Sequence, residues 1–264
     1  MILVKILISI FVAFALIYLF TNRKTQIMRE APHISYTSPS LIDVPTSFDW
    51  RDHGLNIQIP DQGTCGSCWA WSAVMGLQAR FEIAHQNIPS LSAQHILNCS
   101  KYCDSVLWPD SCDEGCTGGL VDHAWIFLRD KGTPDAQSVP FTGHTNECKE
   151  LPTNTKLYFA STVYRVMPSV NLIKAEIAAN GPVSAGMEAY SCFVNHNGQG
   201  IYKQQSGSTY IGPHAVLIVG WDDTEKAWIV ANVWGTGWAQ NGFGKVAWGE
   251  CGIEQGIVTG KPLL

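Results

Sequence analysis

The stretch Gln62-Gly-Thr-Cys-Gly-Ser-Cys-Trp-Ala70 places Cys68 six residues after a side-chain amide, at a point where a helix is expected to begin. The apolar residues that follow recur at three- and four-residue spacing, which predicts one buried helix face. Cys68 therefore lies at the helix N-terminus, where unpaired amides and the positive end of the helix dipole favour a thiolate. This pattern predicts a nucleophilic cysteine with a nearby amide donor.

A thiolate nucleophile needs a base, and two downstream segments supply candidates. His214 opens the apolar run 215–219, where a polar residue at a strand edge can face a cleft while the rest are buried. Asn232 lies within the apolar segment 228–234, in which an unpaired amide would be costly. We expect His214 to exchange a proton with Cys68, and Asn232 to orient the imidazole ring.

These blocks resemble those of the papain family of cysteine peptidases. Cys65-Gly-Ser-Cys-Trp69 matches the family signature around its cysteine. His214 and Asn232 follow Cys68 by 146 and 164 positions, close to the spacing typical of the family. The resemblance covers roughly residues 45–260. It implies an α+β, papain-like two-domain fold, with a helical left domain, a β-barrel-like right domain and the active-site cleft between them.

The resemblance also implies a role for each matching residue. Cys68 would be the nucleophile, His214 the base and then the acid, and Asn232 the orienting group. Gln62 and the backbone N–H of Cys68 would donate to the oxyanion. We therefore expect a cysteine-type endopeptidase that hydrolyses peptide bonds through a Cys68 thiolate/His214 imidazolium pair and an acyl-enzyme intermediate.

Four further positions resemble family residues that contact substrate. Gly118 and Gly119 match the loop that lines the non-primed side of the cleft, where glycine lets a substrate strand approach the backbone. Trp238 matches the tryptophan of the S1′ wall. Gly256 occupies the place of an acidic residue at the floor of the cathepsin B S2 pocket, so an apolar P2 preference is expected.

Nine cysteines in a chain routed to an oxidising compartment suggest four pairs and one free thiol, for which Cys68 is the candidate. By resemblance to cathepsin B, three pairs are expected. They are Cys65–Cys116, Cys99–Cys148 and Cys103–Cys112. Cys192 and Cys251 remain, and a fourth bridge between them is left open.

The C-terminal run Cys251-Gly-Ile-Glu-Gln-Gly256 and the extra pair Cys103 and Cys112 are most similar to cathepsin B-like members. Cathepsin B carries a long insertion with paired histidines that blocks the primed side of its cleft. Here only residues 132–147 fill that interval, with His144 as the one histidine. An open cleft, and hence endopeptidase action, is expected.

The chain divides into three parts. Residues 1–20 are apolar after Lys5 and indicate a signal peptide, or a signal anchor if they are not cleaved. Residues 21–43 are polar and contain two prolines, which indicates a short propeptide or linker. Residues 44–264 form the peptidase, with a helical half at about 60–150 and a β-rich half at about 151–264.

Within the peptidase, the pattern predicts helices from Cys68, at 120–129 and at 169–180, and strands at 156–166, 214–221, 227–234 and 242–248.

A net charge of −5 without any basic run excludes nucleic acid as an expected partner. No cofactor or metal signal appears. The expected partners are peptide or protein substrates and protein inhibitors of cysteine peptidases. We expect a monomer that contacts a membrane only if the N-terminal segment is retained.

Three other interpretations compete. The pair Cys65 and Cys68 fits a Cys-x-x-Cys redox motif, but the strand and helix alternation of such a fold is missing before residue 60. A zinc site could use Cys65, Cys68, Cys112 and Cys116. A catalytically silent papain-fold protein that binds peptides or inhibits a partner is the main alternative function.

The leader predicts that the protein enters the secretory pathway and resides in a lysosome- or endosome-like vesicle or outside the cell.

Overall fold

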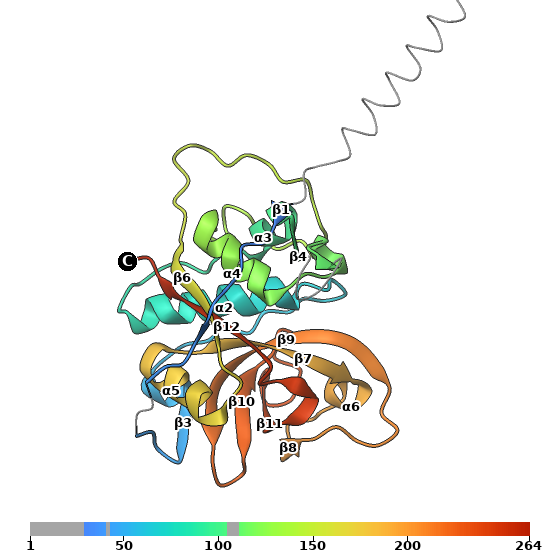
Figure 1. Ribbon diagram of the computed structural model, residues 1–264. Helices are drawn as coiled ribbons and strands as arrows, with labels where there is room; N and C mark the ends of the chain where they lie inside the picture. The colour runs from blue at the N-terminus through green and yellow to red at the C-terminus, as the bar shows by residue number, and fades with distance from the viewer. Residues whose placement is uncertain (1–28, 41–42, 105–110) are drawn as a thin grey trace, which may run out of the picture.

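The computed structural model describes residues 29–40, 43–104 and 111–264. The expected leader at 1–20 lies outside these residues, so the choice between signal peptide and anchor stays a prediction. No helix in the described part is long and apolar enough to cross a membrane. Figure 1 shows helices gathered at one end of the molecule and a large sheet at the other, with β6 (Ala160–Val166) and β12 (Gly256–Pro262) running between them.

The chain forms five helices and three short 3₁₀ turns within the described residues. The helices are α2 (Cys68–Ile83), α3 (Ala93–Cys99), α4 (Val121–Asp130), α5 (Val170–Asn180) and α6 (Ser191–Val194). The 3₁₀ turns are η1 (Trp50–His53), η2 (Gly115–Thr117) and η3 (Glu250–Gly252).

Most strands join one mixed sheet in the order β2-β6-β12-β7-β9-β10-β11-β8, with β3 also paired to β9. They are β2 (Tyr36–Thr37), β3 (Ser47–Asp49), β6 (Ala160–Val166), β7 (Val183–Tyr190), β8 (Ile201–Tyr202), β9 (Tyr210–Asp222), β10 (Ala227–Ala231), β11 (Phe243–Ala247) and β12 (Gly256–Pro262). A small second sheet contains β1 (Arg29–Glu30), β4 (Tyr102–Asp104) and β5 (Ser111–Cys112).

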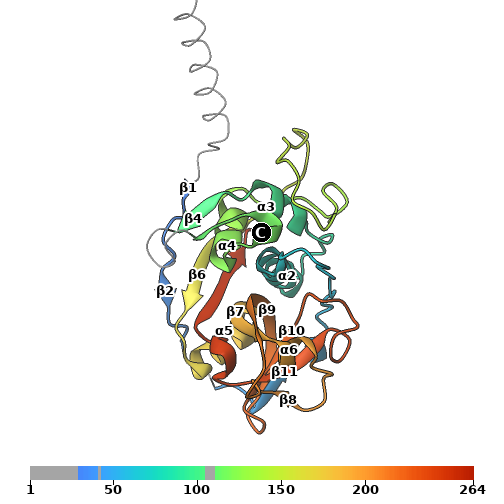
Figure 2. The ribbon, with the colours of Figure 1, turned by 90° about the vertical axis from the view of Figure 1, so that its right-hand side faces the viewer.

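Helix α2 is buried on nearly all sides because it lies between the other helices and the sheet (Figure 2). Trp69 and Leu77 pack in the helical core, whereas Met75 packs against Leu217 of β9. Gly76 permits this close packing, since a Cβ there would lie 2.9 Å from the ring of Trp125. The position of α2, and with it Cys68, is therefore fixed by both halves of the molecule.

A chain of buried hydrogen bonds locks α2 onto strand β9. The hydroxyl of Ser72 donates to the carbonyl of Val216 at 2.9 Å. Ser184 of β7 donates to the carbonyl of Ser72 at 3.0 Å and accepts from the indole N–H of Trp125. Because each buried polar group has a partner, the network fixes the register between the helix that carries Cys68 and the strand that carries His214.

The other end of α2 is anchored by a buried ion pair. Arg80 donates to Glu176 of α5 at 2.9 Å, and the two side chains are 1% and 2% exposed. Arg80 also donates to the carbonyls of Gly181 and Pro182, and Glu176 accepts from the hydroxyl of Tyr164. Burial raises the pKa of Tyr164 to about 12, so this hydroxyl remains a donor.

The N-terminal segment is paired with the body of the protein and is not a free linker. Strand β1 pairs in parallel with β4, and β2 pairs in parallel with β6. The amide of Ala31 donates to the carbonyl of Cys103, and that of Arg165 donates to the carbonyl of Ser35. The sequence gives no strong signal for these strands because each contains only two residues.

The α+β class is confirmed, as are helices beginning at Cys68 and spanning most of 120–129 and 169–180. Three strand boundaries differ from the prediction by three or four residues, the first being that of β6, which begins at Ala160 and not at residue 156. Strand β9 begins at Tyr210, four residues before His214, and strand β10 ends at Ala231, so Asn232 follows the strand instead of lying inside it. Helix α3 was not predicted, since its seven residues are too few for a clear period.

Candidate active site

The expected catalytic residues come from both halves of the molecule and meet at their boundary. Cys68 is the first residue of α2, and Gln62 lies in the loop before it. His214 lies on β9, and Asn232 directly follows β10. The backbone of Ala215, next to His214, hydrogen-bonds to the Cys68 thiol. The fold therefore brings the thiol beside the strand that carries the imidazole.

His214 and Asn232 form a buried hydrogen bond. The His214 Nε2 atom lies 2.8 Å from Asn232 Oδ1. The same Oδ1 accepts from the backbone N–H of Val233 at 2.8 Å, which identifies this atom as the oxygen because an amide N–H can only donate. An oxygen there requires a proton on Nε2. The neutral ring therefore keeps the lone pair on Nδ1, the nitrogen that can accept a proton from Cys68.

Aromatic rings enclose this hydrogen bond. Trp234 stacks on the His214 ring with centroids 4.4 Å apart and so covers the pair. Phe193 contacts His214, Trp234 and Trp238, and its carbonyl accepts from the Trp238 indole N–H at 3.0 Å. Asn232 is fully buried. The rings thus exclude water from the bond that orients the imidazole.

Burial makes an isolated charge on either catalytic group unfavourable. It raises the pKa of the Cys68 thiol, although hydrogen bonds from the backbone of Ala215, Trp69 and Cys68 itself act to lower it. Burial also lowers the pKa of His214 to about 4, against a smaller opposite effect from Asn232. When a proton moves from Cys68 to His214, the thiolate and the imidazolium attract each other, and this attraction offsets the cost of burying each charge. The two groups are therefore expected to titrate together.

Gln62 is held by the loop that precedes α2. Its Nε2 donates to the carbonyl of Cys65 at 2.7 Å, and its backbone N–H donates to Val233, next to Asn232. A primary amide has two N–H bonds, so one remains for an oxyanion. The Gln62 side chain is 8% exposed. The backbone hydrogen bond to Val233 couples the position of this donor to that of Asn232.

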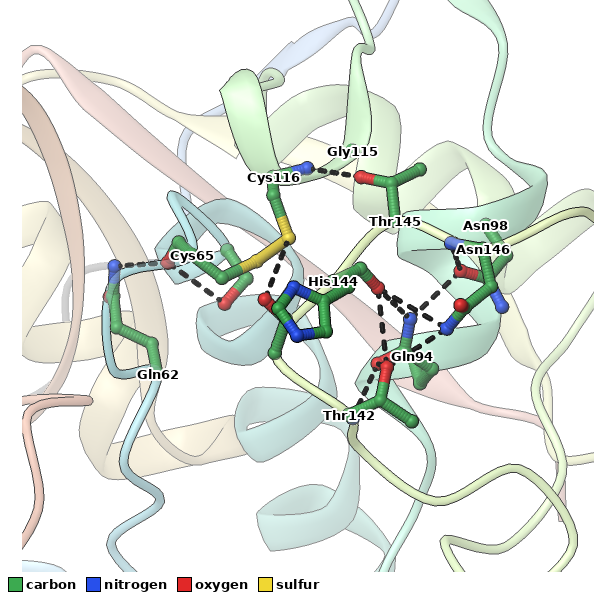
Figure 3. The surroundings of a disulfide bond; sticks show 12 residues. Gln62, Cys65, Gln94, Asn98, Gly115, Cys116, Thr142, His144, Thr145 and Asn146 are labelled. Atoms are coloured by element: carbon green, nitrogen blue, oxygen red, sulfur yellow. Dashed lines mark hydrogen bonds between the residues drawn. A yellow bond between two sulfur atoms is a disulfide. The ribbon is translucent and has the colours of Figure 1, made fainter.

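Figure 3 shows how a disulfide ties this loop to the neighbouring glycine loop. Cys65 and Cys116 are bonded, and the amide of Gly66 donates to the carbonyl of Cys116 at 2.8 Å. Gly119 lies against the Trp69 ring, where a Cβ would come within 2.6 Å. Gly118 has a positive φ and open space around its Cβ direction. The backbone at Gly118 and Gly119 is therefore held beside the start of α2.

Residues 142–146 are fixed to the helical half by a side-chain network that the sequence did not reveal (Figure 3). Gln94 of α3 accepts from the backbone N–H of Thr142 and donates to the carbonyl of His144, each at 2.8 Å. Thr145 accepts from the backbone N–H of Cys116 at 2.7 Å. The segment therefore packs back against α3 and the disulfide. Only a long-range contact could have indicated this role for Gln94.

The remaining substrate positions differ in exposure. Trp238 is 6% exposed, so only a small part of its surface is available to a ligand. Gly256 begins β12 and pairs with Gly186 of β7. A Cβ on Gly256 would meet the Gly186 backbone at 3.4 to 3.6 Å, an ordinary contact distance.

The cysteines separate the competing interpretations. The three expected bridges Cys65–Cys116, Cys99–Cys148 and Cys103–Cys112 are formed. The bridged cysteines cannot also serve as a Cys65/Cys68 redox motif or as zinc ligands, so both alternatives are wrong. Cys192 and Cys251 are free in the structure and do not form a fourth bridge. Among the described residues, no group of acidic, histidine or cysteine side chains is arranged to hold a metal ion.

Comparison with known proteins connects this geometry to a family. The model of the papain family cysteine proteases matches residues 44–261. Cysteine proteinase 1 of Zea mays is 31% identical, with 88% of this chain and 66% of that protein covered. Procathepsin L of Felis catus is 34% identical, covering 83% and 66%, and cathepsin B-like cysteine proteinase 6 of Caenorhabditis elegans is 32% identical, covering 88% and 70%.

Among solved structures, a Carica candamarcensis cysteine protease in complex with E-64 matches with a TM-score of 0.69 and 29% identity. The match covers 83% of this chain and 99% of that chain. The chain spans about two thirds of the length of the first two relatives above.

Proposed function

The chain belongs to the papain family of cysteine proteases, and from this premise we propose that it hydrolyses internal peptide bonds with Cys68 as its nucleophile. The observation that carries the proposal is the His214 Nε2–Asn232 Oδ1 hydrogen bond, because it leaves Nδ1 as the free base. A silent protein would have no need for a tautomer fixed in this way.

In the first step, the Cys68 thiol transfers its proton to His214 Nδ1. Asn232 keeps accepting from Nε2, so the imidazolium is held in place while its charge stabilises the thiolate. The helix dipole and the backbone N–H groups around the sulfur favour the same charge. The thiolate sulfur then attacks the carbonyl carbon of the peptide bond, and its electron pair forms the new S–C bond.

In the second step, the carbonyl oxygen becomes an oxyanion. The second N–H of Gln62 and the backbone N–H of Cys68 are the proposed donors to that oxygen. Collapse of the intermediate breaks the C–N bond, and imidazolium Nδ1–H gives its proton to the leaving amine. Water, deprotonated by the same Nδ1, attacks the resulting thioester and releases the acid with a free thiol.

Endopeptidase action is supported by residues 132–147, which stand where cathepsin B carries its blocking insertion. The carbonyl oxygen of Gly143 lies 3.6 Å from Cys116 Sγ, and the carbonyl of the next residue, His144, accepts from Gln94 (Figure 3). A segment anchored to α3 is a poor clamp for a substrate C-terminus on the primed side. We propose that Gly118 and Gly119 pair with the substrate backbone, and that Trp238 borders S1′.

Within the family, we propose a cathepsin B-like member that lacks the blocking insertion. The Cys103–Cys112 disulfide and the Cys251–Gly256 run support this assignment. Gly256 would leave the S2 pocket without an acidic group, which favours an apolar P2 side chain. The proposed setting is the secretory pathway, where protein inhibitors of cysteine peptidases and protein substrates are the expected partners.

The test compares the wild type with Cys68→Ser on internally quenched peptides whose two termini are blocked. The proposal expects cleavage within the peptide by the wild type and none by Cys68→Ser. Blocked peptides distinguish endopeptidase from exopeptidase action. A folded wild type that binds peptides without cleaving them, with unchanged affinity in Cys68→Ser, would support the silent peptide-binding alternative.

A further inference from the structure

Two thiols outside the catalytic site both lie close to one tyrosine hydroxyl, that of Tyr202. Cys192 Sγ in α6 lies 3.3 Å from the Tyr202 hydroxyl, and Cys251 Sγ in η3 lies 3.8 Å from it. The two sulfurs are thus no more than about 7 Å apart. Both thiols are half-buried and outside the three disulfides. The proposed peptidase mechanism uses neither.

The surroundings give the two thiols different roles. Burial acts to raise the pKa of Cys192, but hydrogen bonds, led by those with the side chains of Ser208 and Tyr202, outweigh it and lower that pKa. Burial raises the pKa of Cys251, and it also keeps Tyr202 protonated. Cys192 therefore supplies more of the attacking thiolate, whereas Cys251 stays protonated and serves as the second thiol.

We propose that Cys192 and Cys251 form a redox-active pair that closes to a disulfide by exchange with a small disulfide such as oxidised glutathione. The Cys192 thiolate attacks one glutathione sulfur, which breaks the S–S bond and releases glutathione thiolate. Cys251 then loses its proton to solvent base and attacks the Cys192 sulfur. The second glutathione leaves as a thiolate, so two protein thiols are oxidised and one disulfide is reduced to two thiols.

Closing this bond connects to the catalytic site through one aromatic residue. Forming the S–S bond moves the two sulfurs relative to the Tyr202 hydroxyl that contacts them, and the Tyr202 ring packs with its centroid 4.8 Å from that of Phe193. Phe193 follows Cys192 in the chain and contacts His214, and its carbonyl holds Trp238. Oxidation would therefore shift the aromatic cluster that encloses the catalytic imidazole.

The experiment uses the full chain carrying Cys68→Ser, so that Cys192 and Cys251 are its only free thiols and the result does not depend on peptidase activity. After treatment with oxidised glutathione, mass spectrometry should find the Cys192–Cys251 disulfide and the loss of two hydrogens. Adding Cys251→Ser should trap a glutathione adduct on Cys192. Adding Cys192→Ser instead should give a slower adduct on Cys251.

Two results would overturn the pair. One is that both thiols still react with an alkylating reagent after oxidation. The other is that the glutathione adduct on Cys192 persists while Cys251 is present, since a resolving thiol must displace it.

A separate observation concerns the N-terminal segment. Residues 29–40 form a strap across the protein, with β1 on the small sheet and β2 on the edge of the large one. Ile34 packs against both the helical core and the sheet core. Arg165 donates to Asp122 at 2.5 Å and to the Tyr36 hydroxyl at 3.3 Å. The strap therefore connects the two halves.

The strap lies far from the catalytic histidine. Strands β6, β12 and β7 separate β2 from β9, which carries His214. Four strand spacings correspond to about 19 Å. Figure 2 shows β2 at the outer edge beside β6, with β9 and β10 across the sheet. We infer that residues 29–40 hold the two halves together and do not mask the candidate active site. The second part of this inference rests on the proposed function.

The test is Ile34→Asp in the full chain, with Ser38→Asp as an exposed control in the same segment. Undocking should lower Tm by about 3 to 6 °C, since it removes a half-buried aliphatic contact. The value of kcat/KM per active site, counted with E-64, should not rise. A rise in kcat/KM would show that the segment masks the active site, and an unchanged Tm would show that the segment does not hold the two halves together. If the chain cleaves no peptide, the proposed function fails, but the Tm comparison still tests the strap.

Discussion

The side-chain oxygen of Asn232 accepts both from His214 Nε2 and from the backbone N–H of Val233, each at 2.8 Å. The second bond fixes the amide orientation, and the first then fixes the tautomer of the histidine. A single asparagine placed just after β10 thus prepares the nitrogen that takes the proton of Cys68.

Asn232→Ala should lower kcat by about 10²-fold, because the ring loses the group that orients it as a base. KM should change much less, since Asn232 is fully buried and does not face substrate. Steady-state kinetics on a blocked peptide checks this split. Asn154→Ala, at an exposed position, should keep the wild-type kcat; equal losses in the two variants would rule out an orienting role.

The buried imidazole should make stability depend on pH once its partner thiolate is removed. Burial lowers the pKa of folded His214 to about 4, below its ordinary value of 6.5. Between these two values the unfolded chain binds more protons, so stability rises with pH in that window and is lost as pH falls from 6.5 towards 4.

In the Cys68→Ser background, His214 should therefore cost about 2 to 3 kcal/mol of unfolding free energy on going from pH 7 to pH 4.5. Urea unfolding at both pH values measures this loss. Cys68→Ser/His214→Gln supplies the reference, because the other titrating groups are shared. The same pH slope in both chains would contradict a depressed pKa for His214.

Gly256→Glu should extend the P2 preference to basic side chains. The added Cβ would have ordinary contacts with the Gly186 backbone, so the change should be accommodated. A carboxylate at the floor of S2 would form a charge-assisted hydrogen bond with arginine, which is worth about tenfold in kcat/KM or more. Paired substrates with P2 arginine and P2 leucine measure this ratio. Efficient cleavage by the wild type of substrates that carry arginine at P2 would show that the apolar assignment is wrong.

Arg80→Met should destabilise the protein by about 3 to 5 kcal/mol, because it leaves the Glu176 carboxylate buried without its cation. For a chain of this size, that corresponds to a fall in Tm of about 10 °C. Arg129→Met is the matched control, since the Arg129–Asp130 pair is exposed and contributes about 0 to 1 kcal/mol. Thermal unfolding of the two variants should therefore differ clearly.

Local patterns in the sequence predicted much of this arrangement. The helix from Cys68 follows from its apolar spacing, and the blocks around His214 and Asn232 are continuous in sequence. Contacts between distant segments were not predictable in this way. The residues next to Ser72 and Ser184 in the sequence give no sign of a special role, yet the hydrogen bonds of these two serines join α2 to the sheet.

The same limit applies to the N-terminal segment and to the second thiol pair. Residues 29–40 lack a strand period because their pairing needs only two residues at each end. Cys192 and Cys251 were recognised only as the two unassigned cysteines. Their shared partner, Tyr202, is set by the position of the short strand β8.

The most direct test of the central claim is to locate the adduct of a peptide-like epoxide, E-64, by mass spectrometry of the full chain. The proposed site predicts one adduct, on Cys68, that a peptide substrate suppresses and that Cys68→Ser abolishes. Labelling should also slow strongly in His214→Gln, although Cys192 and Cys251 remain available. A folded protein that gains no adduct, or that gains it on Cys192 or Cys251 as readily as on Cys68, would contradict an assembled Cys68–His214 pair.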